Sequence, residues 1–357
     1  MAQPTAAPPP SRRPPGRHRE NGASAAPTRS RSQIRRYAAL DLGTNNCRLL
    51  IAQPNAEGFT VVDAFSRIVR LGEGLAATGR LSEAAVDRAL SALSICADKL
   101  RRRNVTLVRS VATEACRRAE NGRAFVDRVY AETGIALEII TPEQEARLAV
   151  MGCHALLEPG DGRALIFDIG GGSTELVLIE TGASDGQPRV IDWFSAPWGV
   201  VSLTESGPID QHEHEDGRFY AYGAMRQRVA DAFRPFAERL DSHDDGTPGR
   251  LLGTSGTVTT LASVHLGLPR YDRRAVDGLV VPTPAMRAIS GRLAGMSLSE
   301  RMRLPCIGQE RADLVVAGCA ILEGILDLWP ADRIGVADRG IREGILRSLM
   351  ARDGHRW

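Results

Sequence analysis

Two short glycine-rich turns carry the residue types that bind phosphate and magnesium. One turn reads Asp41-Leu-Gly-Thr-Asn45, and the other reads Asp168-Ile-Gly-Gly-Gly-Ser-Thr174. Glycine leaves backbone N–H groups open to an anion because no Cβ blocks the approach. Mg²⁺ favours a few carboxylates together with phosphate oxygens, so Asp41 and Asp168 are the predicted metal ligands. The phosphate-binding residues predicted in the two turns are Thr44, Asn45, Gly170, Gly171, Gly172, Ser173 and Thr174.

The two turns repeat one design at different places in the chain. Each Asp follows an apolar stretch, and seven positions after each Asp stands a charged residue, Arg48 in one case and Glu175 in the other. Two hairpins of one design predict a duplicated α/β domain with a ligand in the crevice between the halves. The alternative is a pair of tight hairpins without a ligand. Three consecutive glycines weaken a hairpin unless something approaches closely, which favours phosphate binding for the second turn and leaves the first open.

A third turn and several charged residues could complete a hydrolytic site. Gly253-Thr-Ser-Gly256 lies between an apolar stretch and a helix start, where the helix dipole favours anions. Its predicted phosphate-binding residues are Gly253, Ser255 and Gly256. Phosphoryl transfer to water needs a base and cations that offset charge in the transition state. The candidate bases are Glu143, Glu145 and Glu175, and the candidate cations are Arg48 and Arg117. Acids at a helix start also complement its dipole, so residue types alone leave these roles open.

The elements that position these residues alternate between strands and helices. Apolar stretches predict strands at 37–42, 48–53, 105–111, 135–140, 163–169, 173–180 and around 251–252. Helices are predicted at 82–103, through 125–129, from Thr141 to about 157, and at 221–240, 284–293, 310–328 and 340–350. Thr141-Pro-Glu-Gln144 is typical of a capping box with Pro at the first helical position. Stretches 181–190 and 206–217 are predicted to be loops.

Composition separates a basic N-terminal tail from the rest of the 357-residue chain. Residues 1–36 hold eight Arg and one acid among many Pro, Ala and Ser, so we expect a disordered tail, and they lack the apolar middle of a secretory signal. A basic arm that touches nucleic acid or other polyanions is the alternative to an extension without specific function, which is favoured. The remaining chain has five more acidic than basic residues, and we therefore expect no specific nucleic-acid partner. No apolar run reaches the length of a membrane span. Six scattered cysteines fit free thiols in a reducing cytoplasm better than disulfides or zinc ligands.

Several ordered motifs resemble those of the exopolyphosphatase and guanosine pentaphosphatase (Ppx/GppA) family. The matching stretches, which together span most of 37–350, are 38–52, 111–119, 138–148, 166–177, 198–205, 251–262 and 335–346. The resemblance implies an α/β fold of duplicated actin-like ATPase (ribonuclease H-like) domains with mixed sheets and a cleft between them. It implies domains at 37–162 and 163–357, with the last helix packing on the first domain.

The family resemblance also implies roles for individual residues. Glu145 matches the general base, whereas Glu143 becomes part of the helix start. Arg117 and Arg48 match phosphate ligands. Glu175 matches an acid implicated in catalysis and metal binding, as does Asp168. The cofactor implied is Mg²⁺.

The chain departs from longer family members, which carry a C-terminal helical domain resembling HD phosphohydrolases. About ten residues follow the last motif, so we expect a short, two-domain form with a weaker grip on long polyphosphate. His243-Asp244 and His212-Glu-His214 are interpreted as loop residues and not as metal ligands.

The sequence therefore predicts a cytoplasmic, Mg²⁺-dependent exopolyphosphatase that releases orthophosphate from the end of polyphosphate. The close alternative is hydrolysis of pppGpp to ppGpp. A nucleotide sensor with little turnover and a sugar or acetate kinase of the same superfold are further alternatives. A homodimer is left open.

Overall fold

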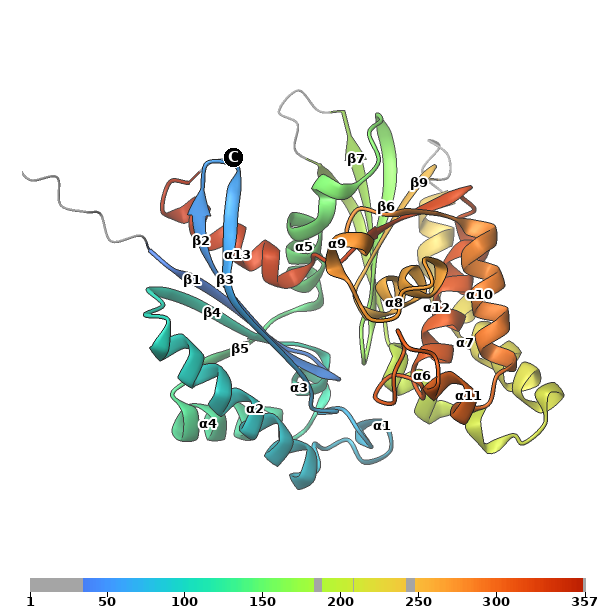
Figure 1. Cartoon of the computed structure of the whole chain (residues 1–357), viewed down its shortest axis with the longest axis horizontal. Helices are drawn as coiled ribbons and strands as arrows, with labels where there is room; N and C mark the ends of the chain where they lie inside the picture. Colours follow the sequence, from blue (N-terminus) through green and yellow to red (C-terminus); the bar gives the residue numbers. More distant parts are fainter. Residues whose placement is uncertain (1–34, 183–187, 208, 242–247, 356–357) are drawn as a thin grey trace, which may run out of the picture. The chain divides into compact units, whose positions relative to one another are not determined.

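The structure is a computed structural model that describes residues 35–182, 188–207, 209–241 and 248–355, and these form two mixed β-sheets with flanking helices (Figure 1). The strands are β1 (Tyr37–Leu42), β2 (Asn46–Asn55), β3 (Gly58–Ile68), β4 (Leu107–Ala112), β5 (Leu137–Ile139), β6 (Gly162–Ile169), β7 (Thr174–Thr181), β8 (Arg189–Ala196), β9 (Arg250–Thr254), β10 (Val280–Pro282) and β11 (Arg333–Ala337). The α-helices are α1 (Leu75–Thr78), α2 (Glu83–Arg102), α3 (Glu114–Arg118), α4 (Gly122–Thr133), α5 (Pro142–Cys153), α6 (Val200–Ser206), α7 (Glu215–Asp241), α8 (Gly256–His265), α9 (Arg273–Val276), α10 (Thr283–Gly295), α11 (Leu298–Met302), α12 (Val315–Leu328) and α13 (Ile341–Arg352). Two short 3-10 helices are η1 (His154–Leu156) and η2 (Ile209–Gln211).

The two sheets share one topology, which confirms the predicted duplication. The first sheet has the order β3-β2-β1-β4-β5, and the second contains the equivalent order β8-β7-β6-β9-β11, with β10 added at the edge. In both, the hairpin strands pair antiparallel and the following strands pair parallel. The sequence echo has the same register in space, because Asp41 pairs with Arg48 and Asp168 pairs with Glu175. The α/β class with two mixed sheets is therefore confirmed.

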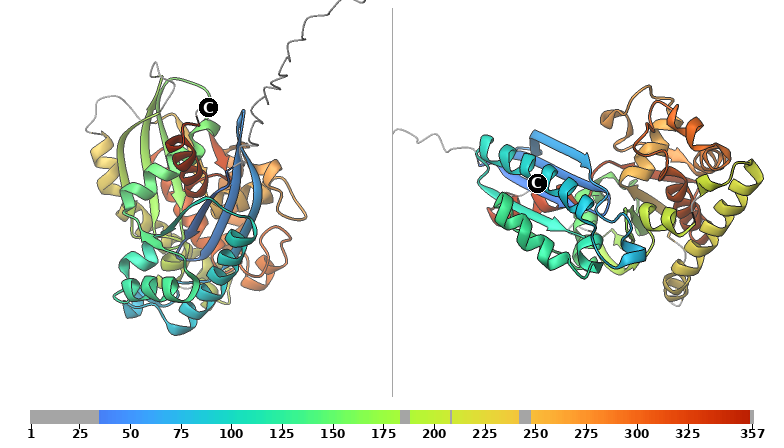
Figure 2. Two further views of the ribbon diagram at one scale, coloured as in Figure 1. Left: turned by 90° about the vertical axis from the view of Figure 1, so that its left-hand side faces the viewer. Right: turned by 90° about the horizontal axis from the view of Figure 1, so that it is seen from below.

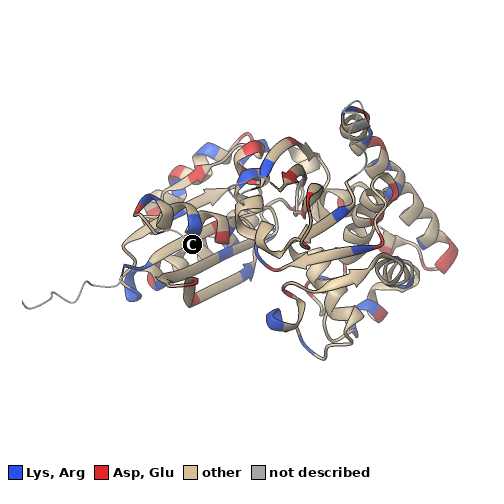
Figure 3. Cartoon of the chain, turned by 90° about the horizontal axis from the view of Figure 1, so that it is seen from above, with Lys and Arg blue, Asp and Glu red and all other residues tan. Residues whose placement is uncertain are grey.

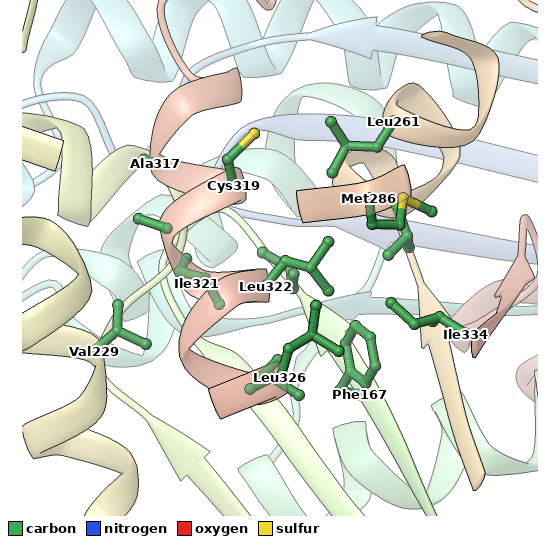
Figure 4. Close-up of a cluster of buried hydrophobic side chains, with 14 of the residues drawn as sticks. Phe167, Val229, Leu261, Met286, Ala317, Cys319, Ile321, Leu322, Leu326 and Ile334 are labelled. Atoms are coloured by element: carbon green, nitrogen blue, oxygen red, sulfur yellow. The ribbon is translucent and has the colours of Figure 1, made fainter. Parts of the chain in front are cut away.

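Each sheet is covered by helices whose apolar faces form its core. Helix α2 lies on the first sheet, with buried residues such as Val86, Leu90 and Leu93 at the spacing predicted from the sequence. The second sheet packs on the long helices α7 and α12, and Figure 2 shows these helices grouped in the C-terminal half. Figure 4 shows this core, where Phe167 of β6 lies among Leu322 and Leu326 of α12 and Ile334 of β11.

The last helix packs against elements of the N-terminal half. Helix α13 contacts α5 and β1, and its residues Ile345 and Leu349 join a buried cluster with Tyr37 and Leu148. The contact with α5 is unusually close: a Cβ on Gly344 would lie 2.0 Å from the carbonyl oxygen of Leu148. The start of α13 lies against the last turn of α5, because a Cβ on Gly152 would lie 1.9 Å from the carbonyl oxygen of Gly340.

Several strands lacked a clear pattern in the sequence. Four strands were not predicted, namely β3, β8, β10 and β11, and the stretch 206–217 contains η2 and the first residues of α7 instead of being only a loop. Helix α12 begins at Val315, later than predicted, because residues 310–314 form turns. The predicted tail, residues 1–36, lies outside the described residues except for its last two. Among the described residues, none of the helices combines the length and the apolar character that a bilayer crossing requires.

Candidate active site

The predicted turns meet around one cavity, called here the central cavity. It is lined by the turns that follow β1, β6, β9 and β11, together with the first residues of α3, α5, α8 and α13. Of the residues predicted from the sequence, those that line it are Asp41, Thr44, Asn45, Arg48, Glu145, Asp168, Gly170, Gly171, Gly172, Ser173, Glu175, Ser255 and Gly256. Three predicted residues, Arg117, Thr174 and Gly253, do not line it. The duplicated hairpins thus bring most of the predicted site residues together.

The first two turns have equivalent backbone geometry. The amide of Gly43 donates to the carbonyl of Asn46 at 2.9 Å, and the amide of Gly170 donates to the carbonyl of Ser173 at 3.0 Å. In each case the glycine stands two positions after the Asp. The duplication therefore extends from the sheet order down to a single hydrogen bond.

Helix α6 holds the second turn so that its amides remain available. Val200 and Val201, at the start of α6, donate their amides to the carbonyls of Gly170 and Gly171 at 2.9 and 2.8 Å. Three backbone amides of this turn donate no hydrogen bond to any described residue. They are those of Gly171, Gly172 and Ser173. Unpaired amides that line a cavity are the donors that an anionic oxygen requires.

The glycines of the second turn are also required by close packing. A Cβ on Gly171 would lie 3.0 Å from both the amide nitrogen of Asn45 and the Cβ of Thr44. A Cβ on Gly172 would lie 2.6 Å from the Thr44 hydroxyl oxygen, and a Cβ on Gly199 would lie 2.4 Å from the backbone of Gly171. The two turns are therefore in contact across the cavity. The glycines of the second turn are needed partly because the first turn packs closely against them.

The third turn contributes a strained residue and the start of a helix. Ser255 has φ 80°, a backbone conformation that L-residues rarely adopt, and its hydroxyl donates to the carbonyl of Ile169 at 2.6 Å. Gly256 follows as the first residue of α8, where a Cβ would lie 3.9 Å from Nη2 of Arg48. Gly253 instead serves packing, because a Cβ there would lie 2.7 Å from the Phe167 ring. Thr174 is fully buried and donates to the carbonyl of Trp198 at 2.7 Å.

Asp41 and Asp168 form the part of the cavity suited to a cation. Loss of hydration raises the pKa of Asp168 to about 6, and repulsion from Asp41 adds to this, while Arg48 opposes it. Loss of hydration likewise raises the pKa of Asp41. The Oδ1 atom of Asp41 has no hydrogen-bond partner in the described part of the chain. An orphan carboxylate oxygen beside a second, repelling carboxylate fits a divalent ion such as Mg²⁺, which takes few protein ligands and completes its shell with water and phosphate. Within the described residues, no group of three or more metal-binding side chains occurs.

Glu175 lies on β7 directly across from Asp168. Its Oε1 accepts hydrogen bonds from the hydroxyls of Ser173 at 2.7 Å and Ser195 at 2.9 Å. Burial raises its pKa to about 7, and repulsion from Asp168 adds to the effect, although the two hydroxyls oppose it. Glu175 can therefore exchange a proton near neutral pH.

Glu145 is placed in the cavity wall by the start of α5. The predicted capping box is confirmed: the Gln144 amide donates to the Thr141 hydroxyl at 3.2 Å, and the Thr141 amide donates to the Gln144 side chain at 2.9 Å. Glu145 is 7% exposed. Burial raises its pKa well above the ordinary value, repulsion from Glu175 adds to this, and Arg117 only partly offsets it. Glu143, in the same turn, instead pairs with Arg147 at 2.8 Å and stays outside the cavity.

Arg117 lies behind Glu145. Its guanidinium donates to Glu145 Oε2 at 3.2 and 3.3 Å, to Glu114 Oε2 at 2.7 and 3.1 Å, and to the carbonyl of Ile140 at 2.6 Å. These contacts use the donors that a phosphate ligand would need. In this arrangement Arg117 orients the carboxylate of Glu145, and the predicted contact with phosphate has no counterpart in the geometry.

Sequence reasoning assigned no role to the turn between β11 and α13 or to Arg311. Asp338, Arg339 and Arg342 from this turn and helix start line the central cavity, as does Arg311. The signal was present in part, because three of these residues fall in the stretch 335–346 that resembles the family's closing motif. Their inward direction depends on the packing of α13 on α5, which no local pattern reports.

Charged residues of both signs are mixed on the rest of the described surface (Figure 3). Figure 3 shows Lys and Arg interspersed with Asp and Glu on both halves of the view. His212 and His214 are exposed and line none of the cavities, whereas His243-Asp244 lies outside the described residues.

Comparison with known proteins gives a consistent result. A model of the Ppx/GppA phosphatase family matches residues 50–353. The chain is 33% identical over 333 residues to exopolyphosphatase 2 of Mycobacterium tuberculosis (strain CDC 1551 / Oshkosh), covering 88% of this chain and 99% of that protein. It is 27% identical over 318 residues to the guanosine-5'-triphosphate,3'-diphosphate pyrophosphatase of Aeromonas hydrophila, covering 88% of this chain and 59% of that protein.

Solved structures show the same similarity. A crystal structure of the Aquifex aeolicus member of the Ppx/GppA family has a TM-score of 0.71 at 31% identity, covering 90% of this chain and 100% of that one. A crystal structure of an exopolyphosphatase from Cytophaga hutchinsonii has a TM-score of 0.74 at 26% identity, covering 90% and 99%.

Proposed function

We propose that this chain, which belongs to the Ppx/GppA phosphatase family, is an exopolyphosphatase that releases orthophosphate from the end of polyphosphate. The observation that carries the proposal is the position of Glu145. Its carboxylate lines the cavity formed by the glycine turns and is held from behind by Arg117. A phosphate-binding cavity alone would also suit a kinase or a sensor. A carboxylate base held in its wall is what hydrolysis adds.

The residues have separate tasks in this reaction. The amides of the turns and Arg48 hold the terminal phosphoryl group. A water molecule attacks the phosphorus atom of this group, and Glu145 accepts a proton from that water. The bond from phosphorus to the bridging oxygen breaks, and the shortened chain leaves with that oxygen. The raised pKa of Glu145 makes its carboxylate a stronger base than an ordinary Glu.

Asp41 and Asp168 would hold Mg²⁺ in this proposal, because one has an orphan oxygen and the two repel each other. Bound there, the ion would neutralise charge on the phosphate oxygens. Glu175, which accepts hydrogen bonds from Ser173 and Ser195, lies beside these carboxylates, and its own charge would influence whether they are protonated. A direct check is calorimetric titration of Mg²⁺ into wild-type protein and into Asp168→Asn, with binding expected only in the former.

The central test is a kinetic comparison of Glu145→Gln with Glu143→Gln. Both variants change an acid in the first turn of α5, but only Glu145 lines the cavity. We expect phosphate release from polyphosphate to fall about 10²- to 10⁴-fold in Glu145→Gln, the range typical of a general base, and to stay near wild type in Glu143→Gln. Absence of hydrolysis by folded wild-type protein, with polyphosphate and with pppGpp, would reject the proposal.

The alternative substrate is pppGpp, which is supported by the similarity to the Aeromonas hydrophila pyrophosphatase. The chain matches nearly the whole length of exopolyphosphatase 2 but about three-fifths of the pyrophosphatase, and this favours polyphosphate. Measuring kcat/KM for both substrates side by side decides between them. Guanine-nucleotide binding without turnover, unchanged in Glu145→Gln, would indicate a sensor instead.

The remaining expectations stay proposals. We keep two domains at 37–162 and 163–357 as a proposal; this boundary falls directly after Gly162, the first residue of β6. A cytoplasmic location is supported by six cysteines that are all free thiols. The homodimer stays a prediction, which sedimentation of the purified chain would test.

A further inference from the structure

A dense set of ion pairs surrounds the turn between β11 and α13. Arg273 of α9 pairs with Asp338 at 2.9 Å and with Glu343 at 2.8 Å. The second oxygen of Glu343 accepts from the amide of Gly340 at 3.0 Å. Arg339 pairs with Asp277 at 2.8 Å. The acids around this turn are thus already engaged by cations or amides.

Arg342 is left out of this network. It lines the central cavity, and no hydrogen bond or ion pair joins its guanidinium to any residue in the described part of the chain. Its immediate neighbour Glu343 is occupied by Arg273. Burial lowers the pKa of Arg342, and although Glu343 opposes this, Arg48 adds to the lowering. A cation withdrawn from water next to a second cation is unfavourable unless an anion joins them.

The backbone holds Arg342 in this position firmly. A Cβ on Gly152 of α5 would lie 1.9 Å from the carbonyl oxygen of Gly340, so the start of α13 lies directly against α5. The Thr254 hydroxyl donates to the carbonyl of Arg339 at 2.6 Å and ties the same turn to the end of β9. The backbone of this segment is therefore held from two sides, which fixes the point from which the Arg342 side chain leaves the chain.

We propose that Arg342 is a phosphate-binding residue that, together with Arg48, grips the terminal phosphoryl group. Both guanidinium groups line the central cavity without a hydrogen-bond or ion-pair partner among the residues that the structure describes, and Asp41 with its orphan oxygen lies near them. A guanidinium fork matches two phosphate oxygens and makes charge-assisted hydrogen bonds. The assignment rests on the proposed function in that the bound phosphate is taken to be the one released by hydrolysis.

The test measures binding of inorganic phosphate by calorimetry in magnesium buffer, where no turnover occurs. The variants are Arg342→Gln, Arg342→Lys and, as a matched control, Arg347→Gln, which removes an arginine from the same helix but outside the cavity. We expect phosphate affinity to fall roughly 10- to 100-fold in Arg342→Gln, as for loss of a hydrogen bond to a charged group. Affinity should be partly restored in Arg342→Lys and stay near wild type in Arg347→Gln.

Thermal unfolding without ligand separates binding from a structural role. Because Arg342 has no hydrogen-bond or ion-pair partner within 35–182, 188–207, 209–241 and 248–355, Arg342→Gln should unfold at the same temperature as wild type or higher. Wild-type phosphate affinity in Arg342→Gln, or no phosphate binding by the wild type, would overturn the assignment. A folded wild type that hydrolyses neither polyphosphate nor pppGpp, yet binds phosphate through Arg342, would support the assignment and contradict only the proposed function.

Discussion

Replacing Glu175 with Gln is expected to make the protein more stable and less active. Gln keeps the size of the side chain and an oxygen that can accept from Ser173 and Ser195, so the change removes little except the charge. In the fold, burial and then repulsion from Asp168 raise the pKa of Glu175 from 4.5 to about 7. This rise in pKa of about 2.5 units corresponds to about 3 kcal/mol in the free energy of unfolding, at 1.36 kcal/mol for each unit.

The direction of the pH dependence follows from linkage. The folded protein holds the Glu175 proton more tightly than the unfolded chain does, so this residue stabilises the fold below pH 4.5. That stability is lost as the pH rises through about 7. Gln does not titrate. The variant should therefore match wild type near pH 4.5 and exceed it by about 3 kcal/mol at pH 8.

The assay is urea unfolding of wild type and variant at pH 5 and pH 8, in EDTA so that no divalent ion offsets the repulsion. Glu180→Gln is the matched control, because it makes the same change on the same strand at an exposed carboxylate that pairs with Arg189. Phosphate release from polyphosphate, measured with Mg²⁺, should fall in Glu175→Gln alone. Equal stabilities at pH 8, or a difference that is the same at both pH values, would refute the account based on burial and repulsion.

A pH profile and two glycine substitutions test other parts of the structure. Because burial raises the pKa of Glu145, the acidic limb of kcat/KM for phosphate release should lie well above pH 4.5 and move lower with added Mg²⁺; a limb at pH 4.5 would argue against Glu145 as the base. Gly171→Ala should lower activity, because its Cβ would lie 3.0 Å from the amide nitrogen of Asn45, while helix content measured by circular dichroism should stay unchanged. Full activity would show that the close contact between the first and second turns is not needed for catalysis. Gly152→Ala should lower the free energy of unfolding by about 1–3 kcal/mol through overpacking, whereas Gly291→Ala, in a helix with open space around it, should not.

The site was predictable where the chemistry is local. Turn residues, the capping box at Thr141 and the Asp-to-charge spacing depend on sterics and hydrogen bonds within a few residues, and the structure places them as expected. Strands β3 and β8 were missed because both are only partly buried, so their sequences lack a strong apolar pattern. Gly253 was predicted to bind phosphate because its turn resembles a phosphate loop, but its lack of a Cβ makes room for the Phe167 ring.

The sequence by itself determined that two equivalent hairpins, each with an Asp and a glycine turn, would line one crevice. Only the tertiary structure decided which arginines line that crevice with their guanidinium groups unoccupied by other described residues. Arg117 was predicted to be a phosphate ligand, but its guanidinium is occupied by Glu114 and Glu145, whereas Arg342 was assigned no role and has no partner in the part of the chain that is described. The physical reason is that the availability of a charged group depends on neighbours far away in the chain, here on the packing of α13 against α5, and no local pattern encodes them.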